Sequence, residues 1–183
     1  VVEYIAENPE RLVLGGETRE LSILFCDLRN FSTISEGLSA SDLTRFMNDY
    51  FTPLTDAILN NEGTIDKYIG DAVLAFWNAP LDIADYRLKS AIASLMMREA
   101  LKKLNEIRII NDEPVISFGI GLHAGRCSVG NMGSERRFDY SILGDSVNLA
   151  SRLEGACKVV ATDILSTREI RDGCPELAWL DLG

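Results

Sequence analysis

The sequence predicts an α+β fold: a ferredoxin-like βαββαβ core with extra C-terminal strands and a helix, in which helices cover one side of an antiparallel-rich sheet. Two observations predict it. Short apolar runs typical of strands alternate with two long segments whose apolar residues recur at helical spacing. Two pairs of successive strands are separated only by short glycine-containing turns, which leaves no room for the crossover helices of a doubly wound sheet.

The first elements are marked by an apolar run and by a helix start signal. The run Leu21–Leu28 is expected to form a buried strand. A helix then begins at Ser39, with Asp42 three residues later as a variant of the capping box, and carries a broad apolar stripe as far as Ile58. Pro53 is expected to kink this helix or to split it in two.

Strand and helix signals alternate along the rest of the chain. Gly70-Asp71 separates two apolar runs and predicts a β-hairpin, and Gly125 is expected to turn one strand into the next. The predicted elements are, in order, hairpin strands 64–69 and 72–77, a long helix over 85–105, strands 115–122 and 127–131, a strand over 138–143, a helix over 145–154, a short strand over 162–165, a capped helix at 166–169 and a strand beginning at 178–182.

One domain is expected, because 183 residues suffice for a single buried core. Residues 1–20 are mixed and polar and are interpreted as a linker into a catalytic domain that spans 21–183. The chain begins at Val1 and ends at Gly183, within what looks like a new strand. We therefore interpret it as a fragment of a longer protein, truncated at its C-terminal end.

Composition argues against several classes of partner. The chain has 28 acidic and 18 basic residues, and its net charge of −10 repels nucleic acid and anionic membranes. No apolar stretch is long enough to span a bilayer, and no signal peptide is visible. The four cysteines form no CxxC pair and there is one histidine, so a zinc site is not expected. We expect reduced thiols and a cytoplasmic domain.

Two aspartates stand at the ends of predicted strands. Asp27 closes the apolar run Leu21–Cys26, and Asp71 lies in the turn of the hairpin. Strand ends cluster at one rim of a sheet, and magnesium is usually held by carboxylates together with substrate phosphates. The pair therefore predicts a metal site for phosphoryl chemistry. Each residue alone has a simpler interpretation, Asp27 as a helix cap and Asp71 as a turn former.

Lys67 breaks the pattern of its strand. It shares a face with Ile65 and Ile69, where a charge is out of place. It is either a cation aimed into a pocket or a side chain that reaches water at the margin of the sheet.

Asn148 and Arg152 lie four residues apart, and so on one face of the helix opened by Gly144-Asp145. They form either part of a site or a solvated polar stripe. The single histidine, His123, lies in an apolar strand and is interpreted as structural.

Four segments of the sequence are similar to a known family, the class III nucleotidyl cyclases, which are the catalytic domains of adenylyl and guanylyl cyclases. The GGE at 15–17 also resembles the lead-in of bacterial members, and four linked motifs at such spacings are highly specific. The resemblance implies the class III cyclase fold over almost the whole chain. The matching segments are LFCDLRNFS (24–32), DKYIGDAVLAFWNAP (66–80), GIGLHAGRCSVGNMG (119–133) and DYSILGDSVNLASRLEG (139–155).

The resemblance implies a metal and phosphate site. Asp27 and Asp71 correspond to the two metal-binding aspartates, and the Leu28 carbonyl to a further ligand of two divalent metal ions, Mg²⁺ or Mn²⁺. The backbone of Asn30, Phe31 and Ser32 is expected to face the β- and γ-phosphates. The phosphate-binding lysine of the family lies on a hairpin beyond the end of this chain.

The resemblance also implies residues that read the base and carry the chemistry. Lys67 corresponds to the base-reading lysine of adenylyl cyclases, where guanylyl cyclases usually have an acid. Ser141 occupies the second base-reading position, an Asp or Thr in many adenylyl cyclases, and is similar to bacterial variants with a hydroxyl there. Asn148 and Arg152 match the pair that positions the ribose and stabilises the transition state.

The function implied is adenylate cyclase, which converts ATP to 3′,5′-cyclic AMP and pyrophosphate by a two-metal mechanism. Deprotonation is assigned to the metals, assisted by Asp27, rather than to His123. A head-to-tail homodimer is implied, because this chain holds residues that the family draws from both sides of a shared site. An upstream sensor region is expected in the full-length chain, with a membrane anchor as one arrangement seen in bacterial relatives.

Other functions remain as alternatives at this point. Guanylate cyclase activity and a catalytically silent dimerisation or nucleotide-sensing domain are the two nearest. A dehalogenase-type phosphatase needs a second aspartate where Arg29 stands, and a diguanylate cyclase needs a GG[DE]EF hairpin that is missing. A receiver domain needs a parallel sheet and an acidic pair, which are also missing.

Overall fold

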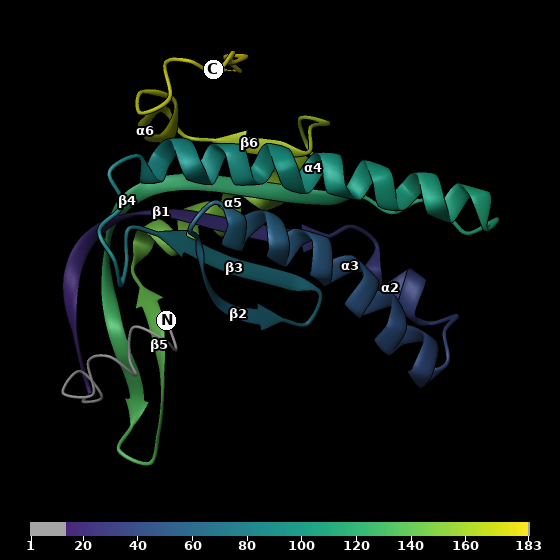
Figure 1. Cartoon of the computed structure of the whole chain (residues 1–183), viewed down its shortest axis with the longest axis horizontal. Coiled ribbons are helices and arrows are strands. Elements are labelled where there is room, and N and C mark those ends of the chain that lie inside the picture. Colours follow the sequence, from purple (N-terminus) through teal and green to yellow (C-terminus); the bar gives the residue numbers. More distant parts are fainter. Residues whose placement is uncertain (1–13, 183) are drawn as a thin grey trace.

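The computed structural model describes residues 14–182, which form a six-stranded sheet with helices on both faces (Figure 1). The strand order is β2-β3-β1-β4-β5, and β6 pairs in parallel with β4. The first four strands in this order pair antiparallel, as a ferredoxin-like βαββαβ core requires, so the predicted fold class is confirmed. The strands are β1 (Gly15–Leu28), β2 (Thr64–Ile69), β3 (Ala72–Trp77), β4 (Phe118–Ser134), β5 (Arg137–Leu143) and β6 (Ile164–Ser166).

The helices follow the predicted order. Ser39 caps α3, because its hydroxyl accepts a hydrogen bond from the Asp42 backbone N–H at 3.2 Å, as the capping box predicts. Helix α3 runs without interruption past Pro53, so the expected split is wrong. The helices are α2 (Phe31–Ser35), α3 (Ala40–Asn60), α4 (Tyr86–Ile110), α5 (Asp145–Cys157) and α6 (Arg168–Arg171).

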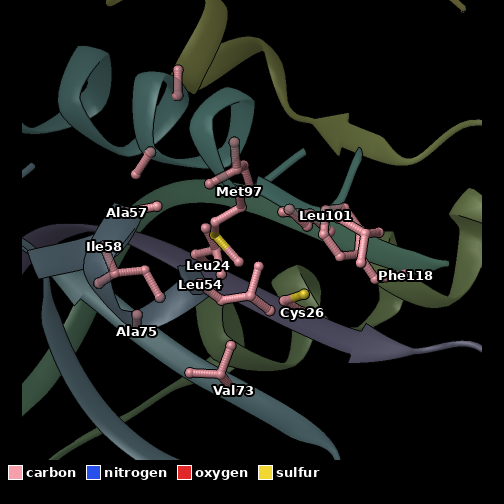
Figure 2. Close-up of a cluster of buried hydrophobic side chains, with 14 of the residues drawn as sticks. Leu24, Cys26, Leu54, Ala57, Ile58, Val73, Ala75, Met97, Leu101 and Phe118 are labelled. Atoms are coloured by element: carbon pink, nitrogen blue, oxygen red, sulfur yellow. The ribbon is translucent and has the colours of Figure 1, made fainter. Parts of the chain in front are cut away.

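The larger core lies between the sheet and helices α3 and α4, which lie side by side across one face (Figure 1). Alternate residues of β1, Leu24 and Cys26, point into it and meet Leu54 of α3 and Met97 of α4 (Figure 2). These four side chains are almost fully buried. The period-two pattern of β1 and the helical stripes of α3 and α4 therefore form one layer of the core.

Helix α5 lies on the opposite face, so the expectation of helices on one side only is wrong. Leu21 and Ile23 of β1 point to this face and form a second cluster with Ala150 of α5. The close approach depends on glycine: a Cβ at Gly121 would overlap the carbonyl oxygen of Ala150. The small residues that alternate along β4 make room for this helix.

Three further predictions about the elements differ from the structure. Strand β1 begins at Gly15, because residues 15–20 pair with the second half of β4. Strand β4 passes through Gly125 without a turn. Residues 178–182 form no strand. Residues 1–13 of the expected linker lie outside the described part of the chain.

The four cysteines are buried and free. Within residues 14–182, no helix combines the length and the apolar character needed to cross a bilayer.

Candidate active site

Asp27 and Asp71 lie together at one rim of the sheet. The β1–β3 register pairs Cys26 with Val73, which brings the residue after Cys26 beside the turn that holds Asp71. The pKa of Asp27 rises to about 6, because the side chain is partly buried and because the Asp71 carboxylate repels its charge. The structure therefore brings the two aspartates close together.

Glu154 of α5 joins this acidic pair. It lies over Gly119, which pairs with Asp27 in the β1–β4 ladder, and a Cβ at Gly119 would collide with its carboxylate oxygen. The pKa of Glu154 rises to about 7, because of burial and the nearby Asp27 and Asp71 carboxylates, while Arg29 opposes the rise. We call Asp27, Asp71 and Glu154 the acidic group.

Among the described residues, no cation forms an ion pair with the acidic group, although Arg29 partly offsets the pKa rise of Glu154. Across residues 14–182, no lysine, arginine or histidine lies within ion-pair distance of its three carboxylates. Like charges held together in a partly buried place raise the free energy of the ionised state. A divalent cation would relieve that repulsion, and carboxylates are the ligands that Mg²⁺ prefers.

Arg29 fixes the turn that follows Asp27. It lies between the expected metal ligands and the expected phosphate contacts. The Arg29 backbone N–H donates to the Ser117 carbonyl at 2.8 Å, and the Arg29 guanidinium donates to the Thr162 carbonyl. Asn30 adopts a left-handed conformation, with φ of 60°, at the N-terminal boundary of α2. The backbone of Asn30, Phe31 and Ser32 therefore leaves β1 directly beside the buried Leu28.

Lys67 and Ser141 meet at a second place. The Lys67 ammonium donates a hydrogen bond to the Ser141 hydroxyl at 3.2 Å. This contact joins β2 and β5, which stand at opposite ends of the strand order, so the sheet curls far enough to bring its two edges together. Asp66 lies against both residues, and we call Asp66, Lys67 and Ser141 the base group.

Asn148 and Arg152 are exposed on α5. They point away from the face that carries Ala150 and Glu154, because positions 150 and 154 face the sheet and 148 and 152 do not. In the described part of the chain, no hydrogen bond or ion pair joins them to the acidic group. The predicted site residues thus form three separate sets within one chain.

His123 is mostly buried, and its Nδ1 lies 3.0 Å from the Thr167 hydroxyl, next to α6. Burial lowers its pKa, so the ring is neutral at pH 7. It tethers α6 to β4.

Residues 15–168 match the family described as the adenylate and guanylate cyclase catalytic domain. The chain belongs to this family. It is 39% identical over 177 residues to an adenylate cyclase of Anabaena cylindrica, a match that covers 93% of this chain and 34% of that protein. The chain therefore spans about a third of the length of this curated relative.

Solved cyclase structures share the fold. The adenylyl cyclase CyaB from P. aeruginosa matches with a TM-score of 0.81 and 32% identity, over 90% of this chain and 84% of that one. The guanylyl cyclase Cya2 matches with a TM-score of 0.79 and the same 32% identity, over 87% and 80%. Overall similarity therefore leaves the base used by this cyclase domain open, and the local chemistry must decide it.

Two site residues of the cyclase domain, Glu154 and Asp66, were not identified from the sequence. Glu154 follows Ala150 by four positions, so it is a charge on the buried face of its helix. A charged residue on a buried face was also the signal that pointed to Lys67, and the same signal could have identified Glu154. Asp66 gave no such signal, because its inward direction comes from an irregularity in β2 that the sequence does not show.

Proposed function

We propose that this cyclase domain is an adenylate cyclase that converts ATP into 3′,5′-cyclic AMP and pyrophosphate. The hydrogen bond between Lys67 and Ser141 carries the proposal. An ammonium only donates hydrogen bonds. It suits adenine, whose N1 accepts, and it opposes guanine, whose N1 carries a hydrogen.

Two members of the acidic group, Asp27 and Asp71, suit the binding of two divalent metal ions, Mg²⁺ or Mn²⁺. Within residues 14–182, no group of three Asp, Glu, His or Cys side chains is placed so that it could hold a metal ion. We therefore assign Asp27, Asp71 and the Leu28 carbonyl as the protein ligands, with substrate phosphates completing the shell. When bound, such ions lower the pKa of an attacking hydroxyl and neutralise charge on a leaving group.

The remaining residues bind and orient the nucleotide. Lys67 and Ser141 hold the base, and the backbone of Asn30, Phe31 and Ser32 lies toward the β- and γ-phosphates. The ribose 3′-oxygen forms a bond to the α-phosphorus as its proton passes to the Asp27 carboxylate, and the bond from that phosphorus to pyrophosphate breaks. Asn148 positions the ribose. Arg152 donates to the transferring phosphoryl group, where negative charge develops.

We propose that a head-to-tail homodimer completes the site. Asn148 and Arg152 are exposed on the face of α5 turned away from the acidic group of their own chain. A second copy can bring its Lys67, Ser141, Asn148 and Arg152 to the acidic group of the first. Two-fold symmetry then gives two equivalent sites, because the acidic group of each copy meets Lys67, Ser141, Asn148 and Arg152 of the other.

Mixing two inactive variants tests this arrangement. Asp27→Ala lacks a metal ligand and Arg152→Ala lacks the phosphoryl contact, so each alone should be inactive. After subunit exchange, about half of the dimers are mixed, and one of their two sites is intact. Cyclic AMP formation should return to about a quarter of the wild-type rate. A mixture no faster than either variant alone would contradict the shared site.

The choice of nucleotide needs its own assay. Cyclic nucleotide is measured from ATP and from GTP, with Mg²⁺ and with Mn²⁺, on the wild-type chain. The proposal expects product mainly from ATP. Product from GTP alone would show that Lys67 has been misread, and no product from either would favour a silent dimerisation or nucleotide-sensing domain.

A further inference from the structure

Asp66 is a buried acid at an irregular point of an edge strand. The β2–β3 register shifts between Ile65 and Lys67, so Asp66 is the extra residue of a β-bulge. Its side chain is completely buried, with 0% exposed, while that of the next residue, Lys67, is 47% exposed. The bulge therefore turns a carboxylate inward beneath the base group. Bulges commonly re-aim a side chain in this way.

The carboxylate of Asp66 organises the other two members of the base group. Its Oδ2 accepts from the Ser141 hydroxyl at 2.9 Å and from the Ile142 backbone N–H at 3.3 Å. Its Oδ1 has the Lys67 ammonium at 3.4 Å and no hydrogen-bond partner in the described residues. The Lys67 ammonium in turn donates to the Ser141 oxygen. A buried acid with these contacts determines how both neighbours can meet a ligand.

The contacts determine the hydrogen-bonding character of Ser141. A serine hydroxyl has one hydrogen to donate and two lone pairs that accept. The hydrogen goes to Asp66 and one lone pair takes a hydrogen from Lys67. One lone pair remains for a ligand, so toward the nucleotide the hydroxyl can only accept.

We infer that Asp66 is a specificity-determining positioning residue, which makes the Ser141 hydroxyl an obligate acceptor and so selects adenine over guanine. Adenine offers an amino group at position 6, which donates to such an acceptor. Guanine offers an oxygen there, which would face the serine lone pair. This inference rests on the proposed function, because it assumes that Lys67 and Ser141 contact the base.

Selectivity is expected to change when the acceptor is removed. In Asp66→Ala, the Ser141 hydrogen is free to turn toward the nucleotide and to donate to the guanine oxygen. The ratio of kcat/KM for ATP to that for GTP should fall about tenfold or more, in line with one mismatched buried hydrogen bond. Asp66→Leu fills the space of the carboxylate without an acceptor and should give the same fall. Asp56→Ala, an exposed acid of α3, is the matched control and should keep the ratio.

A double-variant cycle separates this role from a merely structural one. With Ser141→Ala there is no hydroxyl to orient, so adding Asp66→Ala should leave the ATP-to-GTP ratio of Ser141→Ala unchanged. An equal fall in both backgrounds would overturn the inference, because Asp66 would then act through Lys67 or through the fold. An unchanged ratio in both Asp66→Ala and Asp66→Leu would overturn it as well.

The wild-type assay distinguishes failure of the inference from failure of the proposed function. If the wild-type chain prefers ATP and the Asp66 variants keep that preference, only the role of Asp66 is wrong. If the wild-type chain shows no preference for ATP, the proposed function itself fails. Melting temperatures identify any variant that has lost its fold, and folded variants alone enter the comparison.

Discussion

The acidic group and the base group hold similar numbers of ionisable side chains but balance their charges in opposite ways. In the base group, Asp66 faces the Lys67 ammonium. Two hydrogen bonds, to Asp66 at 2.9 Å and from Lys67 at 3.2 Å, hold the Ser141 hydroxyl in place. In the acidic group, Asp27 and Glu154 lie close to other carboxylates and form no ion pair with a cation of the described residues, and their pKa values rise to about 6 and about 7 although Arg29 partly offsets the rise at Glu154.

This contrast shows what each place is prepared to bind. A group whose charges are already paired and whose side chains are held by hydrogen bonds is preorganised, so it suits a neutral ligand such as a nucleobase, which it recognises by the pattern of donors and acceptors. A group of uncompensated like charges is destabilised until cations arrive, so it suits metal ions. Both conditions hold before any substrate is present.

The largest expected effect separates catalysis from recognition. Asp71→Ala removes one of the two carboxylates proposed as metal ligands, and we expect kcat/KM for ATP to fall about a thousandfold, or about 4 kcal/mol. Excess chelator should have a similar effect on the wild-type chain. The exposed Asp49→Ala on α3 is the control and should keep its activity. Full activity of Asp71→Ala at limiting metal would break the proposed assignment of the acidic group to metal.

The sequence predicts most of the fold because many elements depend on local signals. The hairpin around Gly70-Asp71 forms with the expected bounds, and Ser39 caps its helix as expected. The turn predicted at Gly125 is wrong, because a glycine can mark either a turn or a close approach between two elements. Here a Cβ would collide with Ser146 of α5, so the glycine makes room for a helix, and the strand continues through it.

The candidate site is predictable only in part, for a similar reason. The sequence alone indicated Asp27, Asp71 and Lys67, because each breaks or ends a regular pattern, and the structure places the two aspartates close together. Glu154 and Asp66 act through tertiary placement. The position of Glu154 depends on which face of the sheet α5 covers, and the inward direction of Asp66 depends on a β-bulge. Periodicity gives neither.

The next largest effect is on stability, and substitutions in the two groups should change the free energy of unfolding in opposite directions. The pKa of Asp27 is raised from 3.8 to about 6 in the folded state. Between these values the folded protein binds more protons than the unfolded one, so the free energy of unfolding falls as pH rises through this window, and the full loss is present above it. Without metal at pH 8, Asp27→Asn should therefore be more stable than the wild type, by about 1 kcal/mol after allowance for solvent screening.

Lys67→Met supplies the counterpart, because it leaves the buried Asp66 carboxylate without its cation. It should lower the melting temperature at pH 8, where Asp27→Asn raises it. Thermal unfolding in chelator at pH 4 and pH 8 measures both variants, and the gain from Asp27→Asn should vanish near pH 4. Added Mn²⁺ should stabilise the wild type and leave Asp27→Asn almost unaffected. Equal signs for the two variants would contradict the contrast between the groups.

The smallest expected effect concerns Glu154, which adds charge to the acidic group without being assigned as a ligand. Glu154→Gln removes a charge that attracts the metal through space, so the Kd for Mn²⁺ should rise only about two- to fivefold at pH 8, well under the cost of losing a ligand. Because the pKa of Glu154 lies at about 7, the wild-type affinity should rise more steeply than that of the variant between pH 6 and pH 8. Titration of metal binding at both pH values measures this, with the exposed Glu99→Gln of α4 as control. Loss of binding in Glu154→Gln as complete as in Asp71→Ala would make Glu154 a ligand, and the acidic group would then hold its metals with three side chains rather than two.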